Sequence, residues 1–557
     1  MKSKPILATA VAILCVTGAP TANAGDLTYE WYTAVNNGDL VPGTAKFFNS
    51  YNQPAVNDDG RVVFRARSRG GQGGQGAGQP EHGIFMRDLE AFGAIVTVFT
   101  RGGTVPQPNN ATYGPGKDLA RFNEFPSVPR IDAGSGTIAT RGMSQPVWQN
   151  EVDDTRTGSA GVYTNAGGAP KTAAAMLGDV AGFEYFQVPI PEVAPGTGFD
   201  QFPGSPAVTE RNTIVFKGNF TVDGVGKTGV FYRDVVASKG VSPIELIASS
   251  YTDIPNCTKT SDRTCKFGST APPSAAGKYV VFAGYDNEAK PTAGGIYRAR
   301  LGNKPIKLET IVKIGDPVPG ETGETFKTFG EAVSLSSNGR HVLFWGTWGS
   351  VTDTYEVKMA CSNEGNEGAV KYNYCVKETA KDPYRYVPNH QGFFVRDMQL
   401  GKTVVIAKTG GEFKDFVYWN FSGRVPGMGG GGEGGDDVEE PARWRTATFG
   451  AVSAHGVPSI SAFKARSVDG SDGIYLRKIL PPPSKIGDVT PLLKTGMPGV
   501  MVDPLTPSGA LISSLGIERD GFRGQWLAVS VGMLAEGGTE EDAGWAGLYV
   551  ARFFDEE

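Results

Sequence analysis

The chain has 557 residues, with 53 lysine and arginine side chains against 58 aspartate and glutamate side chains. Its net charge of -5 argues against the clustered basic surface of a nucleic-acid-binding protein, so no nucleic-acid partner is expected. The 77 glycines and 37 prolines indicate many turns, and the 39% of hydrophobic residues are enough for a core. The composition predicts a globular, all-β protein.

The first 24 residues have the pattern of a secretory signal peptide. Lys2 and Lys4 precede an apolar run over residues 6–16, and Ala22 and Ala24 provide the small residues of a cleavage site. This run is shorter than the roughly 20 residues of a membrane-spanning helix, and no later run reaches that length. We therefore expect cleavage near Ala24, a secreted or periplasmic protein without a membrane span, and a single mature domain over residues 25–557.

Both ends of the mature chain carry incomplete strand patterns. The chain reads as repeats of four strands each. Residues 33–43 resemble residues 310–320, which form the fourth strand of one repeat and the turn that leaves it. Residues 547–553 read as a third strand without a fourth one after it. Pairing the two ends would complete one four-stranded unit and remove two open sheet edges. The sequence therefore predicts a ring that is closed by its N-terminal strand.

A glycine, followed by an aliphatic or aromatic residue and then by Phe or Tyr, recurs along the whole mature chain. The seven glycines are Gly83, Gly161, Gly229, Gly295, Gly392, Gly473 and Gly547. A polar turn and a β-branched run precede most copies, and a fourth apolar run follows. Four short strands repeated about every 77 residues are typical of propeller blades. We predict a seven-bladed β-propeller of four-stranded blades, with six or eight blades as the alternatives.

Part of this pattern contains a shorter motif. Ser336, Gly339 and Phe344 keep the spacing of an NxxGxxxAF repeat, with Ser in the place of Asn. From Asn57 to Phe64 the same residue types run one residue short. On these residues the chain resembles a group of exported bacterial proteins with tandem NxxGxxxAF repeats. The resemblance implies a repetitive extracytoplasmic β architecture and no established activity, so it assigns no catalytic residue.

Four cysteines remain after cleavage at Ala24, an even number that suits an oxidising compartment. The simplest of three connectivities joins Cys257 to Cys265 and Cys361 to Cys375. Each such bridge would stabilise the fold by roughly 2.5–3 kcal/mol in the chain-entropy model. Neither pair has the CxxC spacing or the neighbouring histidine of a zinc site. We expect two local disulfides.

The connections between strands differ in length, if the strands of each repeat are named A to D in chain order. The A–B and C–D connections are mostly short, whereas the B–C and D–A connections are long and include insertions at 345–391 and 410–445. Because strand direction alternates, both kinds of long connection lie at one end of the ring, which we call the long-loop face. Long loops on a rigid scaffold often carry function.

Aromatic and basic residues in these connections are the candidate ligand-binding residues, because tryptophan stacks on sugars and arginine anchors polar groups. The predicted set is Trp148, Trp348, Trp419, Trp444, Arg141 and Arg443. The alternative is that each tryptophan packs its own loop onto the ring. Arg-Asp pairs also recur after the C strands, at 87–88, 233–234 and 396–397, where we expect a structural salt bridge or turn device.

Catalytic and metal-binding signals are weak. No HExxH, Walker or GxSxG motif is present, and the catalytic residues are unknown. His82 and His390 precede corresponding C strands and could meet across the central opening. No cofactor and no metal ligand are predicted, although the acidic stretches 429–440 and 469–473 contain the ligand types that calcium prefers.

The sequence thus favours an exported, non-catalytic binding protein. It would bind a polysaccharide or another exported protein through the long-loop face. One alternative is a metal- or calcium-assisted hydrolase or lyase with its site at the central opening. The other alternative is a structural cell-surface protein.

Overall fold

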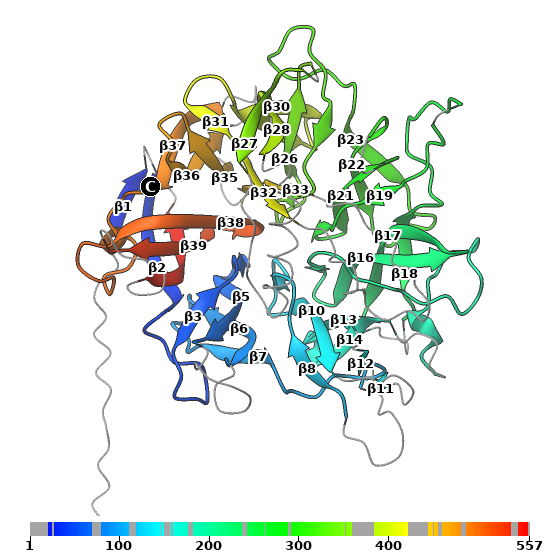
Figure 1. The fold of residues 1–557 in the computed structure, drawn as a ribbon, viewed down its shortest axis with the longest axis horizontal. Coiled ribbons are helices and arrows are strands. Elements are labelled where there is room, and N and C mark those ends of the chain that lie inside the picture. Colours follow the sequence, from blue (N-terminus) through cyan, green and yellow to red (C-terminus); the bar gives the residue numbers. More distant parts are fainter. Residues whose placement is uncertain are drawn as a thin grey trace, which may run out of the picture.

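Seven antiparallel sheets follow one another around a ring in the computed structural model of the protein (Figure 1). The residues that the structure describes are 21–24, 27–69, 80–110, 119–145, 148–149, 156–157, 160–176, 182–236, 242–261, 263–287, 291–350, 352–358, 384–421, 444–448, 450–454, 459–480, 486–535 and 544–554. Over these residues the secondary structure consists of strands and three short 3-10 turns, at Ala166–Gly168, Glu184–Phe186 and Gly499–Met501. The all-β prediction is confirmed.

Each sheet is one blade, and the first three blades come from the N-terminal half of the chain. Blade 1 contains β3 (Phe48–Tyr51), β4 (Ala55–Val56), β5 (Arg61–Ser68), β6 (His82–Asp88) and β7 (Val96–Thr100). Blade 2 contains β8 (Arg121–Glu124), β9 (Arg130–Ile131), β10 (Ile138–Gln145), β13 (Ala160–Thr164) and β14 (Lys171–Ala175). Blade 3 contains β15 (Ala207–Thr209), β16 (Thr213–Val222), β17 (Val225–Asp234) and β18 (Glu245–Ser249).

The remaining blades continue around the ring in chain order. Blade 4 contains β19 (Ser269–Thr270), β20 (Ser274–Ala276), β21 (Tyr279–Tyr285), β22 (Gly294–Arg300) and β23 (Leu308–Lys313). Blade 5 contains β24 (Thr328–Phe329), β25 (Ser334–Leu335), β26 (His341–Trp348), β29 (His390–Asp397) and β30 (Lys402–Lys408). Blade 6 contains β31 (Phe413–Asp415), β34 (Gly450–Ser453), β35 (Ser459–Ser467), β36 (Asp472–Ile479) and β37 (Ile486–Lys494). In five blades two short segments share the place of the A strand and pair with the same B strand.

Blade 7 joins the two ends of the chain. It contains β38 (Leu511–Arg523), β39 (Trp526–Leu534), β40 (Trp545–Phe553), β2 (Leu27–Asn36) and β1 (Thr21–Ala24). The N-terminal strand β2 pairs antiparallel with the C-terminal strand β40, from Tyr29 opposite Phe553 to Asn36 opposite Gly547. The predicted closure by the N-terminal strand is therefore confirmed. The outermost strand β1 lies within the predicted signal peptide.

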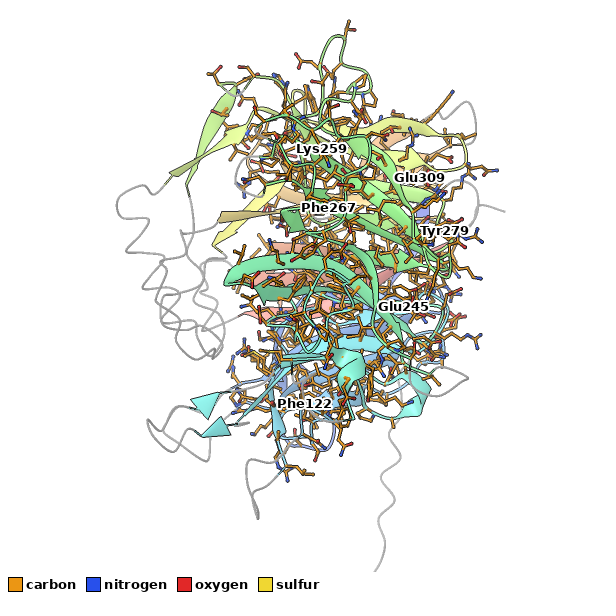
Figure 2. The ribbon with its side chains drawn as sticks, turned by 90° about the vertical axis from the view of Figure 1, so that its right-hand side faces the viewer. Phe122, Glu245, Lys259, Phe267, Tyr279 and Glu309 are labelled. Atoms are coloured by element: carbon orange, nitrogen blue, oxygen red, sulfur yellow. A yellow bond between two sulfur atoms is a disulfide. The ribbon has the colours of Figure 1, made fainter. Side chains whose placement is uncertain are left out.

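The inner strands form the closed contact that defines a propeller. Each contacts the next in the order β4, β9, β15, β20, β25, β34 and β38, and β38 contacts β4 again. The ring thus has seven blades, as predicted. Three two-stranded hairpins are added to it: β11 (Trp148–Gln149) with β12 (Arg156–Thr157), β27 (Thr354–Lys358) with β28 (Tyr384–Pro388), and β32 (Val417–Phe421) with β33 (Trp444–Thr448). They extend from one side of the ring (Figure 2).

The repeated glycine is explained by the aromatic ring two residues later. A Cβ atom on Gly229 would lie 2.7 Å from the ring of Phe231, and one on Gly473 would lie 2.6 Å from the ring of Tyr475. These distances are shorter than any van der Waals contact, so only glycine fits. The Phe231 ring in turn stacks on Phe216 of the neighbouring strand, at 6.0 Å between centroids. The motif therefore marks the core of each blade.

Candidate functional site

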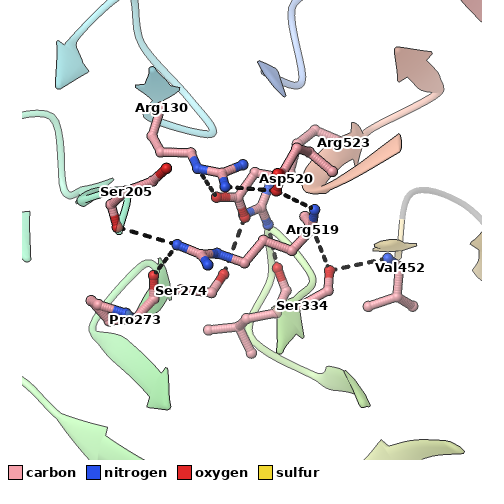
Figure 3. A network of polar contacts seen from close by, with 11 residues as sticks. Arg130, Ser205, Pro273, Ser274, Ser334, Val452, Arg519, Asp520 and Arg523 are labelled. Carbon is pink, nitrogen blue, oxygen red and sulfur yellow. Dashed lines mark hydrogen bonds and ion pairs between the residues drawn. The ribbon is translucent and has the colours of Figure 1, made fainter. Parts of the chain in front are cut away.

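The centre of the ring is filled by charged side chains where the inner strands end at the A–B turns (Figure 3). Arg130 of β9 donates a 2.7 Å hydrogen bond to Glu518 of β38, and Arg523 donates one of 2.7 Å to Asp520. All four side chains are buried, with at most 9% of each residue exposed. Where the inner strands end, these ion pairs occupy the central axis of the ring in place of an open channel.

The same strand, β38, is also hydrogen-bonded to blades 4 and 5 across the ring. Arg519 donates to the carbonyl oxygen of Pro273 at 2.8 Å, and Ser334 donates to the carbonyl oxygen of Arg519 at 2.6 Å. Burial, together with the nearby charge of Arg130, lowers the pKa of Arg519 to about 10. The guanidinium stays charged at neutral pH. Residues 518–523 of β38 thus act as a hub that fixes blades 2, 4, 5 and 7 to one another.

A pocket lined mainly by charged side chains lies at the long-loop end of blades 1 and 2. We call it the arginine pocket, and its members are Arg65, Arg67, His82, Arg101 and Glu124. Arg65 Nε donates a 2.9 Å hydrogen bond to His82 Nε2, and Arg65 Nη2 lies 3.5 Å from Glu124 Oε1. Pro80 and Asn123 complete the lining.

The strand register assembles this pocket. Residues of β5 alternate, so that Arg65 and Arg67 share one face of the strand while the buried Ala66 lies on the other. Arg67 is opposite His82 in the antiparallel pair, and the backbone N–H of Arg101, just after β7, donates to the carbonyl oxygen of His82 at 2.8 Å. Glu124 ends β8 of the next blade. The pocket therefore straddles a blade junction.

The electrostatics of the pocket favour an anionic ligand. Burial first, and then the charges of Arg65, Arg67 and Arg101, lower the pKa of His82 to about 3. His82 is therefore neutral at physiological pH, and since its Nε2 accepts from Arg65, its Nδ1 carries the proton. Among the described residues, neither Arg67 nor Arg101 has a carboxylate within ion-pair distance. Two guanidinium groups are thus available to an incoming anion.

Of the predicted binding residues, Arg141 interacts electrostatically with a member of this pocket, Glu124. Arg141 belongs to β10 of blade 2, and burial lowers its pKa to about 10 while the charge of Glu124 acts in the opposite direction. Glu124 therefore interacts with Arg65 of blade 1 and with Arg141 of its own blade 2. The other predicted arginine, Arg443, lies outside the described residues.

The four predicted tryptophans belong to three different blades. Trp148 lies in the β11 hairpin of blade 2, whereas Trp419 and Trp444 lie in the β32–β33 hairpin of blade 6. Trp348 of blade 5 is only 4% exposed and packs on Phe394 at 5.9 Å between ring centroids. The expectation of an exposed, stacking Trp348 is wrong, because its position at the end of β26 turns the indole into the core.

The two predicted histidines also do not meet. His82 begins β6 of blade 1 and His390 begins β29 of blade 5, and two blades separate them in the shorter direction around the ring. His390 pairs instead with Asp353 of its own blade. Sequence reasoning missed Arg65, Arg67 and Arg101. Their signal was the alternation of arginine along residues 61–69 beside another arginine at the end of the fourth strand.

The recurring Arg-Asp pairs are structural, as predicted, but they do not bind each other. Arg233 donates to backbone carbonyl oxygens, that of Ser242 in its own blade and that of Thr172 in the preceding blade. The acidic partner binds a different arginine: Asp88 pairs with Arg61 at 2.9 Å in blade 1.

The predicted disulfide Cys257–Cys265 is present, which is consistent with an extracytoplasmic protein. Cys361 and Cys375 lie outside the described residues. Within the described ranges, no helix is long and apolar enough to span a membrane, and no three His, Cys, Asp or Glu side chains are grouped as metal ligands. Of the two candidate calcium stretches, 429–440 is not described, and in the other Asp469 is bonded to Ser471 and Lys494.

The closed ring of seven blades defines the protein as a β-propeller. No family model and no curated protein matches the chain, so the resemblance to NxxGxxxAF proteins stays a prediction. Solved structures with a similar arrangement include a Hadza microbial sialidase, at 10% identity and a TM-score of 0.30 over 70% of this chain. This chain spans 63% of that sialidase.

Two further solved structures are matched over nearly their whole length. An oligogalacturonate lyase in complex with manganese is 7% identical, with a TM-score of 0.35, over 96% of this chain and 98% of its own. An α-L-arabinofuranosidase from Fusarium graminearum is 10% identical, with a TM-score of 0.30, over 93% of this chain and 97% of its own. Identities this low describe the propeller fold alone.

These comparisons correct the expectation of a non-catalytic binding protein. The similar propellers are enzymes, namely a sialidase, a lyase and an arabinofuranosidase. They agree better with the alternative of a hydrolase or lyase.

Proposed function

We propose that the protein is a propeller enzyme, a hydrolase or a lyase, that acts on a saccharide bearing carboxylate or sulfate groups. The observation that carries this proposal is the arginine pocket, in which Arg65, Arg67 and Arg101 surround the neutral His82. A planar guanidinium binds an oxyanion through two parallel hydrogen bonds. A neutral sugar has no oxyanion to accept them. The sialidase and the oligogalacturonate lyase named above are propellers named for acidic saccharides, in keeping with this choice of substrate.

Each group of the pocket has a role that its chemistry suits. Arg67 and Arg101 would bind the anion of the substrate, and the Nδ1–H of His82 would donate a further hydrogen bond. Arg65 would position both His82 and Glu124, because it contacts each of them. Glu124 is the single carboxylate of the pocket lining and would accept or return the proton, as in a lyase or in a hydrolase whose second group is not a carboxylate. This arrangement explains why a histidine is kept neutral among arginines.

The test compares acidic and neutral polysaccharides as substrates for the purified chain. We expect cleavage of a polyuronate or a sialylated glycan, and none of dextran. The Arg67→Gln/Arg101→Gln double variant should raise KM for the acidic substrate at least tenfold, since two charge-assisted bonds are lost. Arg300→Gln is the matched control, because Arg300 is an exposed arginine at the C–D turn of blade 4. Equal KM values for both variants would overturn the proposal.

We also propose that the enzyme is exported and acts outside the cytoplasm. Removal of residues 1–24 would deliver the enzyme to the periplasm or the medium, where extracellular polysaccharides are found. Cleavage there would also remove β1, the outermost strand of blade 7. Intact-mass analysis of the exported chain tests this step, and a mature N-terminus upstream of Thr21 would contradict it.

A further inference from the structure

A second polar group lies on the long-loop face of blade 5, away from the arginine pocket. His390 begins β29 and faces Trp348 at the end of β26 in the strand register. The imidazole stacks on the Trp348 indole, with 5.9 Å between ring centroids and 21° between planes. The indole is buried, whereas 46% of the His390 side chain is exposed. The imidazole is therefore fixed on one face and open to solvent elsewhere.

A carboxylate fixes the rotation of this ring. Asp353 Oδ2 pairs with His390 Nε2, and Asp353 Oδ1 accepts a hydrogen bond from Asn389 Nδ2. The backbone holds Asp353 in turn, since its N–H donates to Ser350 and its carbonyl oxygen accepts from Asn389, at 3.0 and 2.9 Å. Each of these bonds restricts the carboxylate to one orientation. The pair is thus a built dyad rather than a chance surface contact.

The backbone beside the dyad is adapted to it. Gly349 has a φ of +92°, and a Cβ atom there would lie 2.7 Å from His390 Cδ2. Any other residue would push the imidazole out of its position over Trp348. With Nε2 bound to the carboxylate, the Nδ1 lone pair of the neutral ring is the available proton acceptor. An exposed imidazole whose far nitrogen is held by a carboxylate has the arrangement of a general base.

The surroundings restrict the reaction that such a base can perform. Glycoside hydrolysis normally needs a pair of carboxyl groups that flank the bond. Asp353 is the dyad's own carboxylate, and it is engaged by His390 and Asn389. Ester hydrolysis needs a single base, since the same imidazole can take a proton from water and return it to the leaving alcohol. The dyad therefore suits acyl esters.

We propose that His390, positioned by Asp353, is the catalytic base of a second activity: hydrolysis of acyl ester substituents on a saccharide. The water O–H bond breaks and its proton passes to His390 Nδ1, while the water oxygen bonds to the acyl carbon. The ester C–O bond then breaks, and the imidazolium gives its proton to the leaving sugar oxygen. The products are a carboxylic acid and a free hydroxyl group. This inference does not depend on the proposed function, because the hydrolysis of a neutral acyl ester does not require an anion to bind in the arginine pocket.

The experiment measures acetate release from acetylated xylan and the hydrolysis of p-nitrophenyl acetate by the full chain. His390→Gln should lower kcat at least 100-fold with little change in KM, because a general base contributes a factor of this order. Asp353→Asn should lower kcat about 10-fold with little change in KM, since the imidazole loses the carboxylate that fixes its rotation. Asp353→Glu should restore part of the rate.

The outcomes separate this inference from the proposed function. Full ester hydrolysis by His390→Gln, or none by the unaltered chain, would overturn the dyad and leave the arginine pocket untouched. Arg300→Gln, on the opposite face, serves as the matched control for both substrates. A chain that releases acetate but cleaves no acidic polysaccharide would support the dyad and contradict the proposed function. Circular dichroism of each variant checks that the β-propeller is folded.

Discussion

Asn36 Nδ2 donates a 2.8 Å hydrogen bond to Asp503 Oδ2, across 467 residues of chain. The carboxylate is 1% exposed, and the same oxygen accepts from Trp545 Nε1 at 2.9 Å and from Tyr549 Oη at 2.8 Å. Asn36 ends strand β2 near the N-terminus, and Trp545 and Tyr549 belong to the last strand, β40. One buried carboxylate therefore holds both ends of the chain in blade 7, beside the seam where the ring closes.

We expect Asp503→Ala to destabilise the closing blade strongly. The substitution leaves three donors without an acceptor, of which those of Asn36 and Tyr549 are buried, so that their desolvation is uncompensated. The free energy of unfolding, measured with urea, should fall by about 3 kcal/mol. The matched control is Asp469→Ala, because Asp469 is exposed and the loss of an exposed ion pair costs little. Equal losses in the two variants would contradict the role of Asp503.

Adjacent blades are also linked by arginines that follow the repeat. Arg233 Nε donates to Ser242 in its own blade at 2.7 Å, and Nη1 donates to Thr172 of the preceding blade at 2.8 Å. Arg87 and Arg477, at the same distance from the repeated glycine, bind carbonyl oxygens of their own and the preceding blade in the same way. A guanidinium satisfies two directions at once, which explains why arginine recurs there.

Arg233→Lys should therefore be costly although the charge is kept. A single ammonium cannot reproduce the two directed bonds, and the stack of the guanidinium on Tyr185 and Phe186 is lost as well. We expect a loss of about 2 kcal/mol in the free energy of unfolding. Arg300→Lys, at an exposed position, should change stability by less than about 0.5 kcal/mol. Thermal unfolding of both variants checks the difference, and equal midpoints would refute the role of the arginine.

The sequence was sufficient for the fold because its signal is local and repeated. Gly229 and Phe231 lie two residues apart, so one short motif reports the packing of a whole blade, and seven copies report the ring. The pairing of β2 with β40 was also visible, since residues 33–43 repeat a pattern found elsewhere in the chain. Periodic sequence features of this kind need no tertiary information.

The candidate site was not predictable in the same way. Arg65 and His82 are 17 residues apart, and Glu124 comes from the next blade, so their meeting depends on strand register and blade packing. Trp348 shows the reverse case, in which residue type suggested exposure although the strand end turns the indole inward. The filling of the central opening by residues 518–523 depends on contacts with several blades. Nonlocal contacts of this kind leave no motif.

The central ion pair should show strong coupling between its partners. Arg130→Met alone leaves the buried carboxylate of Glu518 without its cation, while Asp520 keeps Arg523, and the loss should be about 3–5 kcal/mol. In the Arg130→Met/Glu518→Met double variant, most of this loss should be recovered, because two apolar side chains need no partner. A double-mutant cycle in urea measures the coupling energy. Additive losses would show that the two residues act independently.

The stability of the protein should depend on pH through His82. Its folded-state pKa is about 3, well below the value of roughly 6.5 for an unperturbed histidine. Between these values the unfolded chain binds a proton that the folded chain does not bind. The free energy of unfolding should therefore fall as the pH is lowered from 6.5, by up to about 1.4 kcal/mol per pH unit, and the effect should level off below pH 3.

The measurement compares the unaltered chain with His82→Gln in urea at pH 7 and pH 5, where most carboxylates stay ionised. Other groups contribute equally to both chains, so the difference between the two pH dependences isolates His82. We expect the unaltered chain to lose about 2 kcal/mol more than the variant over this interval. Parallel curves for the unaltered chain and His82→Gln would mean that His82 is protonated in the folded state, and the arginine pocket would then hold one more positive charge.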